Sequence, residues 1–194
     1  MKENLLRKIE REAGKHLRNP KQSVAHREGH VKRVMRYAMQ IAKNYKNADL
    51  ELLKIAVILH DVCEPHDKKE RHVDLSVKVA KKILEKVGCP KEKARRVLEI
   101  ISQHSTEKLQ KPKSLEAKIL FDADKLDGLG ASGIARVFAL FGQQGKEPEK
   151  AIEWYERKIE IALKNLQTKE GKRLARKELK FVREFLKRFK RENP

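Results

Sequence analysis

A histidine and an aspartate stand side by side at the end of an apolar run in the segment VILHDVCEP, where His60 and Asp61 follow residues 57–59. Imidazole and carboxylate groups together suit a divalent transition metal. Neighbouring residues on a helix diverge by about 100°, so this pair needs further ligands from other helices to complete a site. The alternative is structural: Asp61 would accept a hydrogen bond from His60 or from a backbone group at a helix terminus.

Other residues of the right type occur elsewhere in the chain. Of the seven histidines, five lie between residues 26 and 72, close to acidic residues. His30, at the start of a helix with an inward apolar face, is one candidate for a remaining ligand, and the acids of LFDADKLDGLG are others. Glu64 follows His60 by one helical turn, so its carboxylate is predicted to face the same cavity.

The elements that must position these residues are predicted to be helices. Apolar residues recur with helical spacing nearly throughout, glycine and proline mark the breaks, and no segment shows sustained strand alternation. Asp49 is expected to begin the third helix, and Ser23 is a predicted N-cap shortly before the second. The sequence therefore predicts an all-α fold, with helices at residues 5–17, 31–42, 50–61, 73–87, 91–104, 117–124, 134–141, 151–166 and 172–190.

Composition excludes some classes of protein and favours anionic ligands. The 194 residues suffice for one core, and a formal net charge of +19 attracts anions such as nucleotides, phosphorylated metabolites, nucleic acid or an anionic membrane surface. The two cysteines form no CxxC pair, which argues against a zinc finger and against a disulfide-built secreted fold. The N-terminus lacks a signal-peptide pattern, and no window approaches the ~20 apolar residues of a membrane span. We expect a cytoplasmic protein without a membrane partner.

Basic residues are concentrated in the last predicted helix. From Lys164 onward they greatly outnumber acidic residues. A solvated face of an amphipathic helix is the favoured interpretation, because the segment lacks the interleaved exposed aromatic residues that single-strand binding usually employs. Contact with nucleic acid through this basic surface is the alternative.

Three motifs carry a resemblance to a known family. In order, GHVKRVMRYA, ILHDVCEP and FDADKLDGLGASGIARVFA resemble the motifs of the HD-domain metal-dependent phosphohydrolases. The resemblance implies one divalent ion (Mn, Fe, Ni, Co or Mg) held by His30, His60, Asp61 and Asp124. It covers about residues 20–140, so we expect a single domain over residues 1–194, with basic C-terminal helices at 148–191 packed on an HD core.

The resemblance also implies roles for residues around the ion. Glu64 matches an acid that activates or protonates water in relatives, and we predict that it acts in catalysis together with Asp61. Four further residues are predicted to bind substrate, each with a structural alternative. The two histidines would otherwise be polar residues with their hydrogen bonds satisfied, the lysine a surface residue, and the aspartate an acid that orients a ligand. The four residues are His26, His104, Lys125 and Asp127.

The segments DGLGASGIARVF and ISQHS look most like the branch that hydrolyses nucleoside triphosphates to monophosphates and pyrophosphate. One departure concerns a D-x-x-H-D pattern of that branch, which here reads SVAHR, with Arg27 in place of an acid. We predict a phosphohydrolase acting on a nucleotide or related compound, as a monomer or homodimer. The alternatives are a cyclic-nucleotide or RNA phosphodiesterase of the same fold and a non-catalytic nucleic-acid-binding protein.

Overall fold

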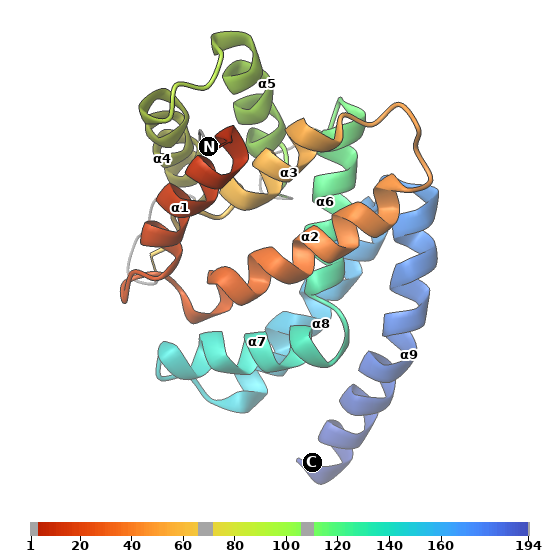
Figure 1. Ribbon diagram of the computed structural model, residues 1–194. Coiled ribbons are helices and arrows are strands. Elements are labelled where there is room, and N and C mark those ends of the chain that lie inside the picture. Colours follow the sequence, from red (N-terminus) through yellow and green to blue (C-terminus); the bar gives the residue numbers. More distant parts are fainter. Residues whose placement is uncertain (1–3, 66–71, 106–110, 194) are drawn as a thin grey trace.

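The computed structural model describes residues 4–65, 72–105 and 111–193, and confirms the predicted all-α fold (Figure 1). These residues form no strand; Gln22 and Pro65 make an isolated β-bridge. None of their helices is both long enough and apolar enough to cross a membrane. The elements are α1 (Leu5–Leu17), a 3-10 turn η1 (Val24–His26), α2 (Glu28–Ala42), α3 (Leu50–Leu59), α4 (His72–Lys86), α5 (Lys91–Ser102), α6 (Leu115–Asp127), α7 (Gly130–Gln143), α8 (Pro148–Asn165) and α9 (Lys169–Glu192).

The short helix α3 lies at the centre of the N-terminal half and contacts α1, α2, α5 and α6. Seven of its ten residues are buried, so it is apolar on most sides, as an element enclosed by neighbours must be. The predicted start is confirmed, because the Asp49 carboxylate accepts a hydrogen bond from the Leu52 amide at 3.0 Å. Burial of α3 brings its C-terminal end, and with it His60, into the interior.

Two predicted boundaries differ from the structure. The third helix was expected to run to Asp61 but ends at Leu59, although His60 keeps helical backbone angles (φ −60°, ψ −40°). Ser23 was expected to cap the second helix; instead its hydroxyl accepts from the Ala25 amide and caps η1, which lies before α2. His60 and Asp61 thus lie in a turn directly after α3, and η1 separates Ser23 from α2; apolar periodicity reveals neither turn.

The helices α2 and α6 pack extensively against each other, and α6 joins α7 through a turn of only two residues. The break expected between residues 124 and 134 is therefore shorter than predicted, since α6 continues to Asp127 and α7 already begins at Gly130. Gly130 has a φ of 69°, which glycine adopts at little cost. A Cβ on Gly133 would clash with the carbonyl of Gly128, so the missing side chain lets α7 start directly against the end of α6.

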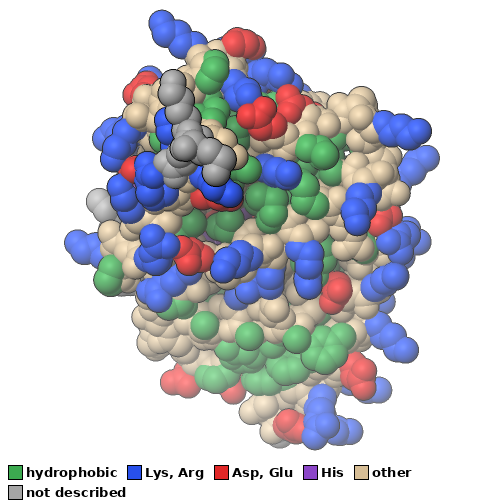
Figure 2. All heavy atoms as spheres, in the orientation of Figure 1, with side chains coloured by type: hydrophobic (Ala, Val, Ile, Leu, Met, Phe, Trp, Pro, Cys, Tyr) green, Lys and Arg blue, Asp and Glu red, His purple; other side chains and the backbone are tan. Residues whose placement is uncertain are grey.

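The C-terminal helices pack on this core. Helix α9 contacts α6, α7 and α8 and buries residues such as Leu174, Leu179 and Val182 (Figure 1). Its C-terminal half also contacts α7, through the rings of Phe185 and Phe138. Lys and Arg side chains are spread over most of the face shown in Figure 2, with hydrophobic side chains grouped toward its lower part. From these packing contacts we propose that the C-terminal helices and the HD core form one domain.

Asp122 on α6 ties the start of α9 to the core. Its buried carboxylate accepts hydrogen bonds from the Gln167 amide at 2.8 Å, the Thr168 amide at 2.7 Å and the Thr168 hydroxyl at 2.6 Å. Asp122 is therefore a structural partner of the segment that leads into α9.

We expect Asp122→Asn to lower the free energy of unfolding by about 2–3 kcal/mol, because the amide nitrogen cannot accept and leaves a buried donor without a partner. Urea denaturation followed by circular dichroism measures this loss. Glu149→Gln, the same change of charge at an exposed position on α8, is the matched control and should change stability little. A variant as stable as the wild type would show that the Asp122 contacts contribute nothing.

Candidate metal centre

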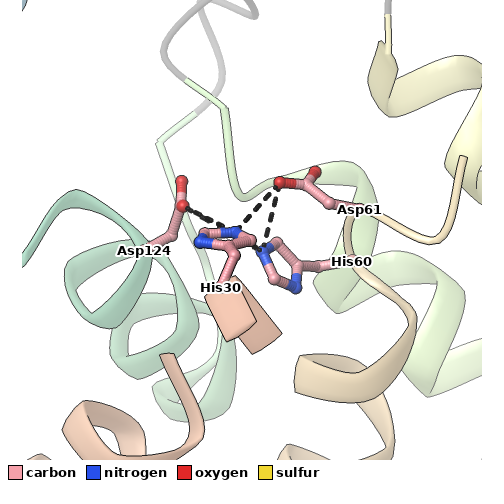
Figure 3. A group of neighbouring side chains, drawn as sticks. All are labelled: His30, His60, Asp61 and Asp124. Atoms are coloured by element: carbon pink, nitrogen blue, oxygen red, sulfur yellow. Dashed lines mark hydrogen bonds and ion pairs between the residues drawn. The ribbon is translucent and has the colours of Figure 1, made fainter. Parts of the chain in front are cut away.

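Four side chains from two helices and from the turn after a third meet in the interior, with their nitrogen and oxygen atoms pointing toward one another (Figure 3). His30 comes from α2, Asp124 from α6, and His60 and Asp61 from the residues directly after α3. The His30 and His60 Nε2 atoms are 3.0 Å apart, and they lie 3.2 and 3.3 Å from the Asp61 Oδ2 atom. The Asp124 Oδ1 atom is 3.6 Å from His30 Nε2 and 4.0 Å from His60 Nε2. Each residue thus offers one ligand atom within 4.8 Å of every other.

The far nitrogen of each histidine is already engaged. His60 Nδ1 lies 2.8 Å from the Val57 carbonyl, which can only accept, so Nδ1 carries the proton and Nε2 presents a lone pair. His30 Nδ1 lies 2.7 Å from an Asp127 oxygen and is assigned in the same way. When both rings are neutral, two imidazole lone pairs and two carboxylate oxygens therefore converge, an arrangement that favours a bound cation.

The spacing of these atoms suits a single ion. Ligands about 2.1 Å from a common metal lie about 3.0–3.4 Å apart when neighbouring on a tetrahedral or octahedral shell. The separations among His30, His60 and Asp61 are of this size, whereas the Asp124 oxygen lies farther out, 3.6 and 4.0 Å from the two histidines. A mixed set of two imidazoles and two carboxylates also differs from the thiolate-rich set of a closed structural zinc site. The donor set thus fits a divalent ion with positions left for water and substrate.

The pKa values of the clustered residues are shifted in the directions that favour positive charge at this place. Burial lowers the pKa of His60, but the Asp61 and Asp124 carboxylates outweigh it and raise the pKa to about 9. Burial raises the pKa of Asp124, yet Lys125, His30 and His60 overcome this and hold it below its usual range. The pKa of Asp61 is likewise lowered, against burial, by His60 and by hydrogen bonds from its histidine neighbours. Both carboxylates are therefore ionised and available as ligands.

Asp127 lies behind His30, 1% exposed, and is surrounded by cations. Besides His30, its oxygens accept from Arg33 Nε and from an Arg136 nitrogen, each at 2.5 Å. Burial raises its pKa, but the bonds from His30 and Arg33 and the charge of Arg136 lower it overall. Because both of its oxygens are engaged, we propose that Asp127 orients His30 rather than contacting substrate.

Glu64 reaches the site from a loop rather than from the end of α3. The Gln22 side chain holds this loop: its amide nitrogen donates to the Asp61 carbonyl and its oxygen accepts from the Glu64 amide, both at 2.9 Å. The Glu64 carboxylate lies 3.1 Å from His26 Nδ1 and, with His26 and Asp61, forms a second group of potential ligands. Burial lowers the pKa of His26 well below its usual value, so His26 is neutral.

The departure from the D-x-x-H-D pattern leaves the cluster itself intact. Arg27, which replaces an acid, directs its guanidinium toward the Pro20 and Gln22 carbonyls at 3.4 Å rather than toward the metal-ligand atoms. Ser23, at the position of the other acid, has its hydroxyl 3.3 Å from His26 Nδ1. These replacements therefore act on the loop that carries His26.

His104 and His72 lie on the other side of Asp61. His104 donates from Nδ1 to the Ile101 carbonyl at 2.7 Å, and its Nε2 is 3.1 Å from Asp61 Oδ1. His72 is the first described residue of α4, and its ring centroid is 5.5 Å from that of His104. Asp61, His72 and His104 form a third group whose ligand atoms lie close together.

A cavity of about 230 Å³ opens onto the cluster. His26, Glu64, His72 and Asp124 line it near the metal-ligand atoms, and residues of α7 and α8 line its other end. Lys125 also lines it, with its ammonium nitrogen 2.7 Å from an Asp124 oxygen. The cavity thus gives a ligand access to carboxylates, imidazoles and a cation at one place.

The structure brings together most of the residues predicted from sequence. The four expected ligands converge, Glu64, His26 and Lys125 line the cavity, His104 contacts Asp61, and Asp127 lies behind His30. No role in the site was predicted from sequence for His72, Gln22 or Arg136, all of which the structure places there. The density of histidines between residues 26 and 72 was a usable signal for His72, whereas no pattern marks Gln22 or Arg136.

Comparison with known proteins identifies the family. The sequence pattern of the HD domain matches residues 27–129, a stretch that contains all four converging residues. The chain belongs to the HD domain family, which confirms the resemblance of the three motifs.

Individual relatives agree with this assignment. The chain is 34% identical over 182 residues to the uncharacterized protein YpgQ of Bacillus subtilis, covering 89% of this chain and 87% of YpgQ. The crystal structure of YpgQ in complex with ADP matches with a TM-score of 0.76 at 27% identity, covering 97% of this chain and 98% of that one. The crystal structure of a predicted HD superfamily hydrolase from an uncultured Thermotogales bacterium matches with a TM-score of 0.63 at 32% identity, covering 97% of this chain and 90% of that one.

We expect His60→Ala and Asp61→Ala each to lose bound metal, because each removes one of four converging ligands. Purified variants are loaded with Mn²⁺, desalted and analysed for metal content, with circular dichroism to verify the helical fold. His16→Ala, at an exposed position on α1, is the control and should retain the wild-type content. Full occupancy in both variants would contradict the assignment. Two ions per wild-type chain would mean that one of the two other groups, Asp61 with His72 and His104 or Asp61 with His26 and Glu64, also binds metal.

Asp127→Asn should weaken Mn²⁺ binding by about 10–100-fold while leaving all four ligands in place, because partners that orient a ligating histidine typically contribute this much. Titration with Mn²⁺ followed by calorimetry measures the dissociation constant. An unchanged constant would show that the position of His30 does not depend on Asp127.

Proposed function

We propose that the protein is a metal-dependent phosphohydrolase that cleaves a phosphoanhydride or phosphoester bond of a nucleotide. The observation that carries this proposal is the convergence of two imidazole lone pairs and two carboxylates at the end of an accessible cavity. Membership of the HD family, similarity to HD-superfamily hydrolases and the ADP bound to YpgQ support it. The net charge of +19 favours an anionic substrate.

When bound, a divalent ion supplies charge stabilisation to a phosphoryl group and makes water more acidic. His30, His60, Asp61 and Asp124 would hold it. Asp127 keeps His30 in the tautomer that leaves Nε2 free, and the Val57 carbonyl does the same for His60. Lys125, beside Asp124 in the cavity, adds a positive charge where a phosphate would lie.

Glu64 is the proposed general base. Its carboxylate lines the cavity beside Asp61 and His26, within reach of a water placed between the metal ligands and a phosphorus atom. Neutral His26 can hydrogen-bond to this carboxylate and hold it in place. His104, through its contact with Asp61 Oδ1, is proposed to steady that ligand as well as to approach the substrate.

Within this class we propose the nucleotide pyrophosphohydrolase reaction, in which a nucleoside triphosphate gives a monophosphate and pyrophosphate. A panel of nucleoside triphosphates, monophosphates, cyclic nucleotides and short RNA, each with Mn²⁺, Co²⁺ or Mg²⁺, tests it by chromatography of the products. Release of pyrophosphate is the expected result. Turnover of cyclic nucleotides or RNA alone would indicate a phosphodiesterase, and binding of RNA without turnover would indicate a nucleic-acid-binding protein.

Glu64→Gln should lower kcat by at least ~10² while metal content and substrate affinity stay close to normal, because the amide keeps the size of the side chain but cannot take a proton. Glu99→Gln, an exposed change on α5, is the control. Turnover and metal content are measured on the same preparation. A change of only a few-fold would show that Glu64 has a structural role, and a joint loss of metal and rate would make it a ligand.

A further inference from the structure

The cavity has two chemically different ends. Near the metal-ligand atoms its walls are ionisable, with Asp61, Glu64, Asp124 and Lys125. At the other end the walls are largely apolar and belong to α7 and α8, including Leu140, Trp154 and Ile161.

This apolar end is formed by two facing helix surfaces. On α7 the lining residues Gly133, Val137 and Leu140 recur at helical spacing, as do Trp154, Lys158 and Ile161 on α8, and the two helices contact each other. Residues three and four apart share one side of a helix, so each helix presents a continuous strip to the cavity. Ile161 is 43% exposed and Leu140 and Trp154 are partly exposed, so apolar surface remains accessible there.

Directional polar groups at this end are mostly engaged elsewhere. The Tyr155 hydroxyl donates to the Gly128 carbonyl at 2.9 Å, and the Arg136 guanidinium binds Asp127 and the Ala25 carbonyl. The Lys158 ammonium lies 5.2 Å from the centre of the Trp154 ring. The surface offered to a ligand is therefore mainly aliphatic and aromatic.

A nucleotide has the same polarity along its length, with charged phosphates at one end and a flat, largely apolar base at the other. We infer that the strip formed by Leu140, Trp154 and Ile161 is a nucleobase-binding subsite, an inference that rests on the proposed nucleotide hydrolysis. Phosphates then lie at the metal-ligand atoms and Lys125. The family pattern ends at residue 129, so this subsite is formed by helices outside the matched region.

Two non-cleavable ligands distinguish binding of the base from binding of the phosphates. They are α,β-methylene-ADP, which carries a base, and methylenediphosphonate, which does not. We expect the Mn²⁺-loaded wild-type protein to bind α,β-methylene-ADP at least about tenfold more tightly. Ile161→Ala and Leu140→Ala should each weaken that binding about tenfold, the usual effect of trimming an apolar pocket, while binding of methylenediphosphonate stays within about twofold. Calorimetric titration measures both constants, with circular dichroism as the check on folding.

Leu50→Ala is the matched control, because Leu50 is an aliphatic residue of similar exposure, 46%, at the start of α3 and does not line the cavity. It should alter neither constant. Equal binding of the two ligands by the wild type, equal losses for both ligands, or no loss in either variant would overturn the inference.

This binding test can fail or succeed independently of the test for nucleotide hydrolysis. If the protein hydrolyses nucleotides but the variants bind α,β-methylene-ADP normally, the subsite is wrong and the hydrolase proposal stands. If no nucleotide is hydrolysed but the selective loss is found, the hydrolase proposal fails and the subsite binds a nucleotide for another purpose.

Discussion

The Nε2 atoms of His30 and His60 face each other at 3.0 Å beside two ionised carboxylates, and much of the surrounding structure serves to hold them there. Such an arrangement is unfavourable in a buried place unless positive charge is present, because each group has lost its water. Contacts from several elements hold the two imidazole rings in this position. The Val57 carbonyl and Asp127 bind the far nitrogens of the two rings, and the apolar packing of α3 prevents His60 from turning toward solvent.

Basic side chains surround this centre and pair with its acidic residues. Asp127 balances Arg33 and Arg136 while it accepts from His30, and Lys125 pairs with Asp124 at the edge of the cavity. These cations lower the pKa values of the acids without occupying the place where the four ligand atoms meet. The site thus remains anionic at its centre within a strongly basic protein, a combination suited to holding a cation and attracting a polyanion.

The cavity is completed by parts of the chain that contribute no metal ligand. Gln22, from the loop between α1 and η1, joins the loop before α2 to the loop after α3 by hydrogen bonds with Asp61 and Glu64. On the opposite side α7 and α8 form the apolar walls, and α7 is brought close by the glycine contact at its start. The HD core therefore holds the candidate metal centre, whereas the later helices shape the space in front of it.

Local patterns in the sequence determined the helices, the capping of α3 by Asp49 and the candidate ligands, because helical periodicity, caps and the ordered HD motifs are properties of short segments. They could not determine that α3 ends at Leu59, that Ser23 caps η1, or that Asp127 is enclosed by cations from α2 and α7. The inclusion of His72 beside Asp61 and the joining of two loops by Gln22 were also decided by tertiary structure. The surroundings of Asp127, His72 and Gln22 depend on contacts between segments up to about a hundred residues apart, and a side chain's neighbours across such distances are set only when the helices pack. The end of α3 and the cap of η1 are local, but apolar periodicity does not mark short turns.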